Sequence, residues 1–191
     1  MIARPSPTLP LAAFYAAFFV VIGTIQPFWP LWLAAQGLDA REIGVALAVG
    51  VGAKVIGLPI AAHVADRSGE RRRPMVRLAA VSALSFALFA LADGFWTILL
   101  VSLLFFSLWP PVMSLGETLT VMLAKRDGFE YGRVRLWGSL AYIAMALAAG
   151  ALLARVPAGA VYWMILGGVA VTAVTCLALP DAKAAPGYTH R

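Results

Sequence analysis

Long runs of apolar residues, each bounded by charged residues, Gly or Pro, dominate the chain. Each run has about the 20 residues that an α-helix needs to cross the hydrocarbon core of a bilayer. The first run follows Arg4 and is too long for the apolar region of a signal peptide, so we expect an uncleaved helix there. The pattern predicts six transmembrane helices, at residues 11–35, 43–62, 75–92, 95–124, 134–154 and 158–179.

Composition supports a protein that lies in the membrane. Of the 191 residues 62% are hydrophobic and 13% are charged, and the mean hydropathy is +0.86. Soluble domains are about half apolar and a quarter charged. We therefore expect an all-α membrane protein with one six-helix bundle over residues 1–180, followed at 181–191 by a cytoplasmic tail or the start of a linker. Cys176 lies alone in an apolar run, which excludes a disulfide framework and a cysteine-based metal site.

The basic residues are distributed unevenly between the two ends of these spans. Twelve of the 15 Lys and Arg residues fall on one side, in the connectors after the second and fourth spans and at the chain ends. The positive-inside rule then predicts a multi-pass protein of the cell inner membrane with both termini cytoplasmic. Orientation and contact with anionic lipids account for the net charge of +6, so no nucleic-acid partner is needed.

Two charged residues lie well inside predicted spans. A charge near the centre of a span costs about 3 kcal/mol, so it requires a partner, a cavity or a functional reason. Lys54 shares one helical face with Gly50 and Gly57, which favours a functional lysine that points inward. The alternative is a lysine that extends to the membrane interface.

The second such residue, Glu117, has a natural partner on the next span. Arg135, Ser139 and Tyr142 fall on one helical face at the start of the fifth span. A Glu117–Arg135 pair in a water-lined cavity can orient a polar substrate or take part in proton movement. A purely structural link between the two helices is the alternative interpretation.

A stripe of large side chains follows the first span with steps of three and four residues: Tyr15, Phe19, Ile22, Gln26, Trp29 and Leu33. Such spacing more often indicates helix packing than a binding surface. Gln26 and Trp29 nevertheless form a polar and aromatic patch that can line a cavity. The Trp29-Pro30 pair recurs as Trp109-Pro110 in the fourth span, and paired interruptions of this kind point weakly to a binding site in transporters built from inverted repeats.

The connector after the second span contains an acidic residue followed by basic residues and a glycine: Asp66, Arg67, Gly69, Arg71 and Arg72. This pattern resembles the signature loop of the major facilitator superfamily. Ala62 stands at the usual leading Gly and Glu70 at a position where a basic residue is common. The resemblance implies a cytoplasmic gate whose ion pairs break as the two halves of a transporter rock.

The segment entering the fifth span reads Phe129-Glu130-Tyr131-Gly132-Arg133-Val134-Arg135-Leu136-Trp137-Gly138-Ser139. It resembles the lactose permease and phenylpropionate permease branch of that superfamily. In the sugar symporters of this branch, the acidic residue and arginine at the Glu117 and Arg135 spacing contribute to substrate binding, and the aromatic residue at the Tyr142 position stacks on the substrate. The segment 27–33 and the basic residue at position 54 resemble the phenylpropionate permeases of this branch. This resemblance implies an anionic aromatic solute.

Members of this superfamily have twelve helices, and this chain resembles the N-terminal half, a 3+3 inverted repeat. The resemblance implies half of a proton-coupled symporter that needs a second six-helix half, either a separate chain or its own copy. The favoured solute is an aromatic or other monocarboxylate, and the alternative is a sugar or nucleoside. A third interpretation is a truncated membrane interaction protein without transport. The sequence shows no catalytic Ser/His/Asp grouping, metal spacing or phosphate loop, so we expect no enzyme, metal or cofactor.

Overall fold

The computed structural model describes residues 7–68 and 71–180, except the side chains of 64–68. The tail at 181–191 therefore lies outside the described residues. Within the described part the chain is helical without strands, and six of its helices are long and apolar enough to cross a membrane. The predicted fold class and the six spans are confirmed. The helices are α1 (Thr8–Ala35), α2 (Ala40–Ser68), α3 (Arg72–Ala87), α4 (Gly94–Asp127), α5 (Tyr131–Leu153) and α6 (Ala160–Ala178), with the 3-10 turn η1 (Leu88–Leu91) after α3.

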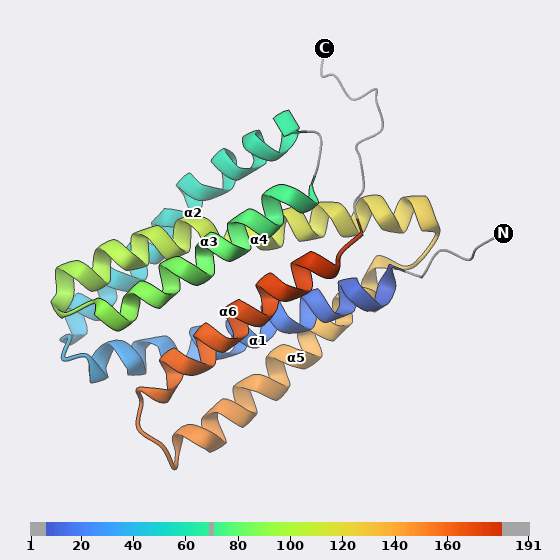
Figure 1. Cartoon of the computed structure of the whole chain (residues 1–191). Coiled ribbons are helices and arrows are strands. Elements are labelled where there is room, and N and C mark those ends of the chain that lie inside the picture. The colour runs from blue at the N-terminus through green and yellow to red at the C-terminus, as the bar shows by residue number, and fades with distance from the viewer. Residues whose placement is uncertain (1–6, 69–70, 181–191) are drawn as a thin grey trace.

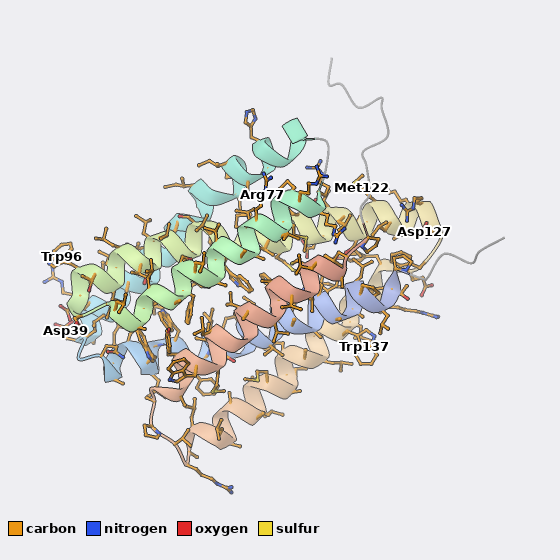
Figure 2. All side chains as sticks on the ribbon, viewed as in Figure 1. Asp39, Arg77, Trp96, Met122, Asp127 and Trp137 are labelled. Carbon is orange, nitrogen blue, oxygen red and sulfur yellow. The ribbon has the colours of Figure 1, made fainter. Side chains whose placement is uncertain are left out.

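Local sequence explains where several helices begin and end. Asp39 and Glu42 form a reciprocal capping box at the start of α2: the Glu42 N–H donates to Asp39 Oδ1 at 2.8 Å, and the Asp39 N–H donates to Glu42 Oε2 at 3.0 Å. Gly128 ends α4 in the left-handed region at φ +75°, where a side chain is strained. Asp39 and Asp127 lie at opposite ends of the bundle in Figure 2.

Helix packing follows a twofold pattern. α1 packs chiefly against α5 and α6, α4 packs chiefly against α2 and α3, and α3 packs against α6. Exchanging α1 with α4, α2 with α5 and α3 with α6 leaves this pattern unchanged. Because α1 and α4 start at opposite ends of the bundle (Figure 1), the two triplets form an inverted repeat.

The α1–α5 and α2–α4 crossings occupy equivalent places in the repeat, and a glycine allows close approach of the backbones at each. A Cβ added to Gly23 on α1 would lie 2.7 Å from the Tyr142 carbonyl oxygen on α5. A Cβ added to Gly57 on α2 would lie 1.9 Å from the Ser107 carbonyl oxygen on α4. Glycine lets the helix backbones touch at both points, as small residues do throughout membrane bundles. These crossings fix α5 against α1 and α2 against α4.

Candidate functional site

Glu117 and Arg135 come together as the sequence predicts. Arg135 Nε lies 3.8 Å from Glu117 Oε1, with 27% of the arginine side chain and 45% of the glutamate side chain exposed. This distance is beyond hydrogen-bond range, so the pair is held by charge attraction and both groups keep hydrogen-bonding capacity for a third molecule. α4 and α5 otherwise have few contacts, so the pair bridges a gap between them.

Aromatic rings of α1 hold the Arg135 guanidinium. Its central carbon lies 4.1 Å from the centre of the Phe19 ring and 5.4 Å from the centre of the Tyr15 ring. Both distances suit a cation–π interaction, which fixes the cation without neutralising it. Gly138 leaves the necessary room, because a Cβ there would lie 2.8 Å from Phe19 Cδ2 and 3.1 Å from Arg135 Nη1.

Tyr15 anchors this platform in the core. Its side chain is fully buried, and its hydroxyl donates to Thr120 Oγ1 at 3.2 Å. Thr120 lies one turn after Glu117 on α4 and donates its own hydroxyl to the Gly116 carbonyl oxygen at 2.7 Å. The contacts thus connect α1 to the part of α4 that carries the carboxylate.

A second polar contact joins α1 and α5 farther along the same face. The Tyr142 hydroxyl donates to Gln26 Oε1 at 3.1 Å, beside the close crossing at Gly23. Ser139 is exposed and lies one turn before Tyr142 on α5. Arg135, Ser139 and Tyr142 therefore present the polar face that the spacing predicts, with a charged end and a hydroxyl-rich end.

Lys54 stands apart from this cluster. It is exposed and makes no hydrogen bond or ion pair with the part of the chain that the structure describes. Gly50 and Gly57, on either side of it, pack against Phe106 and Ser107 of α4. Positions 107 and 117 are about 15 Å apart along a helix axis, so Lys54 lies at a different depth from Glu117.

Trp29 does not line a cavity, and here the structure differs from the expectation. Its side chain is only 2% exposed, and its ring stacks on Trp32 with centroids 4.6 Å apart and meets Phe89 edge-on at 4.9 Å. Trp29 thus packs toward α3 and η1. Trp29 and Gln26 point in different directions, because a step of three residues turns the helix by about 300°, which is short of a full turn. Phe19, treated as packing, instead contacts the arginine.

The expected gating residues are only partly described. Gly69 and the side chains of Asp66 and Arg67 lie outside the described residues. Arg71 precedes α3, and Arg72 donates from Nη2 to the Leu177 carbonyl oxygen. This bond joins the beginning of α3 to the end of α6.

The chain is similar in sequence to a known protein family and to several transporters. Residues 8–188 match the sequence model of the MFS_1 like family. The chain is 35% identical over 135 residues to the "Probable 3-phenylpropionic acid transporter" of Escherichia coli K12, a match that covers 70% of the chain and 35% of that protein. It is 27% identical over 166 residues to the raffinose permease of Escherichia coli, covering 81% of the chain and 38% of the relative.

A third relative is the maltose permease of Geobacillus stearothermophilus, 24% identical over 183 residues, or 93% of the chain and 46% of the permease. The chain thus spans less than half the length of the curated relatives it matches. These relatives are transporters, which confirms the expectation that the chain is not an enzyme.

Proposed function

Because the chain belongs to the MFS_1 like family of the major facilitator superfamily, we propose that it forms one six-helix half of a proton-coupled symporter. The solute is a small organic molecule, an aromatic or other monocarboxylate. A second six-helix half, from another chain or from a second copy, completes the cavity, because alternating access requires two bundles that move against each other. The protein resides in the inner membrane with both termini cytoplasmic.

The ion pair at 3.8 Å is the observation that carries the proposal. Arg135 is held on its aromatic platform while part of its guanidinium stays exposed. A solute carboxylate can therefore form a bidentate pair with the Arg135 guanidinium and displace Glu117. The rings that hold the arginine also provide an apolar contact for an aromatic solute.

Gln26, Ser139 and Tyr142 complete this binding face with hydrogen-bonding groups, and Lys54 supplies a second cation. Glu117 is the carboxylate available for a proton when a solute anion replaces it at Arg135. This exchange links solute binding to protonation and supports the symport part of the proposal. Trp29 supports the site from the core and does not contact solute.

A sugar is the second candidate solute. The raffinose and maltose permeases match a larger share of the chain than the 3-phenylpropionic acid transporter does. The partly exposed Glu117 carboxylate can accept hydrogen bonds from sugar hydroxyl groups, and Ser139 and the Gln26–Tyr142 pair can donate and accept them. In that case Glu117 binds solute directly and is not displaced.

Uptake into vesicles that hold the chain together with a carboxyl-terminal six-helix half tests the proposal. Labelled 3-phenylpropionate and raffinose are the two probes, with and without an imposed proton gradient. We expect gradient-driven 3-phenylpropionate uptake that Glu117→Gln and Arg135→Gln each abolish. Glu130→Gln and Arg133→Gln are matched controls, because these two residues form an exposed ion pair at the start of α5.

Unchanged uptake in both cluster variants would refute the site assignment. Uptake of raffinose alone would show that the solute is a sugar and not a monocarboxylate. Uptake that does not depend on the proton gradient would refute proton coupling. If neither probe enters while the controls insert normally in the membrane, the non-transporting interpretation is favoured.

A further inference from the structure

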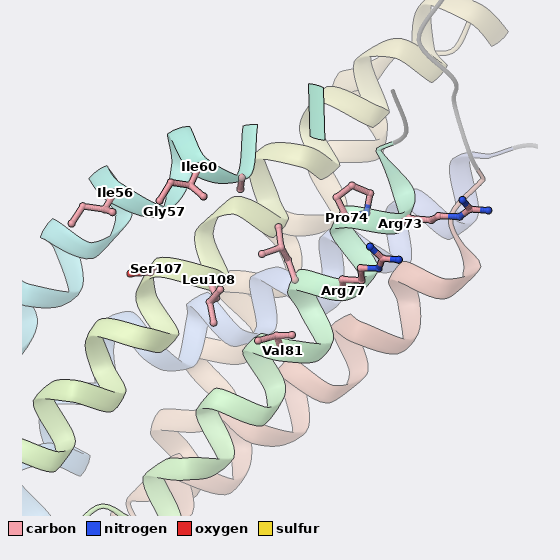
Figure 3. A pocket seen from close by; sticks show the side chains of 11 residues that line it. Ile56, Gly57, Ile60, Arg73, Pro74, Arg77, Val81, Ser107 and Leu108 are labelled. Atoms are coloured by element: carbon pink, nitrogen blue, oxygen red, sulfur yellow. The ribbon is translucent and has the colours of Figure 1, made fainter. Parts of the chain in front are cut away.

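A cleft of about 530 Å³ lies between α2, α3 and α4, away from the Glu117–Arg135 pair that faces α5. Figure 3 shows α2 along one side of it and α3 along the other, with α4 between them. The residues that shape it are Ile56 and Ile60 of α2, Arg73, Arg77 and Val81 of α3, and Leu108 of α4.

The cleft opens toward lipid. Ile56 and Ile60 are 59% and 60% exposed, and Val81 is 46% exposed, although all three lie in membrane-spanning helices. Apolar side chains exposed at this depth contact the acyl chains of the bilayer. A lipid chain therefore has direct sideways access to the apolar part of the cleft.

One end of the cleft is cationic. Arg73 and Arg77 lie one turn apart near the start of α3, and Figure 3 shows them at the same end as Pro74. Arg77 is exposed and makes no ion pair with the described part of the chain, and none of the described lining residues is Asp or Glu. At 1.5 Å per residue Arg77 lies about 8 Å into the helix, near the depth where headgroup phosphates meet acyl chains.

We propose that this cleft binds an anionic phospholipid, with the headgroup phosphate at Arg77 and Arg73 and the first acyl carbons along Ile56, Ile60 and Val81. The charge at one end and the lipid-facing apolar walls match the two parts of such a molecule. A soluble anion would use the arginines and leave the apolar walls without a role.

Native mass spectrometry of the purified chain from micelles with equal amounts of phosphatidylglycerol and phosphatidylcholine tests the proposal. We expect preferential retention of phosphatidylglycerol and a reduction of about fivefold in Arg77→Gln, the effect of one basic residue near an anionic surface. Lys125→Gln is the matched control, because Lys125 is exposed at the same end of the bundle and does not line the cleft.

Val81→Trp separates the cleft from general surface charge, because the indole fills the apolar part and leaves both arginines in place. We expect it to reduce phosphatidylglycerol retention as Arg77→Gln does. Glycerol phosphate, which has the headgroup charge without acyl chains, is expected not to displace the lipid. Equal retention of both lipids, equal effects of Arg77→Gln and Lys125→Gln, wild-type retention in Val81→Trp, or displacement by glycerol phosphate would each overturn the proposal.

Discussion

At the scale of single residues, the contact between Arg135 and Phe19 determines how the guanidinium is presented. The ring centre lies 4.1 Å from the cation, and replacing Phe19 by Leu keeps most of the volume but removes the π face. We expect Phe19→Leu to weaken binding of 3-phenylpropionate about fivefold, equivalent to about 1 kcal/mol. Phe28→Leu on the same helix is the control, and similar binding constants for the two variants would contradict a cation–π role.

Lys54 provides a separate test of solute charge. It is exposed and without an ion pair in the described chain, so its removal leaves no buried partner unsatisfied. Lys54→Gln is expected to reduce uptake of an anionic solute several-fold more than uptake of a neutral one, since it removes a positive charge that attracts anions toward the proposed cavity. Competition between 3-phenylpropionate and its amide measures the difference, and an equal reduction would refute the role of Lys54 in charge selection.

At the scale of elements, the α2–α4 crossing depends on Gly57. An alanine Cβ there would lie 1.9 Å from a backbone oxygen, which cannot rotate away as a side chain can. We expect Gly57→Ala to destabilise the bundle by about 3 kcal/mol, the upper range for overpacking. Thermal unfolding in micelles measures the loss, with Gly52→Ala as the control because an added Cβ there meets nothing within 4 Å.

The helices could be predicted from the sequence because a bilayer imposes a minimum length of apolar residues. Their ends could not, since α2 continues through polar residues to Ser68 and α3 changes to a 3-10 turn at Leu88. The Glu117–Arg135 pair was predictable because both charges need a partner in the membrane. The sequence predicted Trp29 at the cavity and Phe19 in helix packing, whereas Trp29 packs in the core and Phe19 contacts Arg135. Spacing along one helix does not show which neighbouring helix covers each of its sides.

At the scale of the whole molecule, the charge distribution assigns one membrane face to the α2–α3 and α4–α5 connectors. The positive-inside rule predicts that this face is cytoplasmic. Arg155→Cys, between α5 and α6, should react with an impermeant thiol reagent in intact cells, whereas Asp127→Cys should react only after permeabilisation. Cys176 is fully buried and gives little background. The reverse labelling pattern would invert the topology.

Polar groups on the exposed face of α1, α4 and α5 require water or a second bundle, because lipid cannot hydrogen-bond them. Exposed apolar residues on the same helices carry no such requirement. Ser139 and Leu147 of α5 are both exposed, Leu147 at 71%, and each lies within the span. We therefore expect a hydrophilic maleimide to label Ser139→Cys at least tenfold faster than Leu147→Cys in membranes, and 3-phenylpropionate to slow the first reaction only. Equal rates would mean that the Glu117–Arg135 face lies against lipid, and the proposed solute cavity would then have no water-filled route.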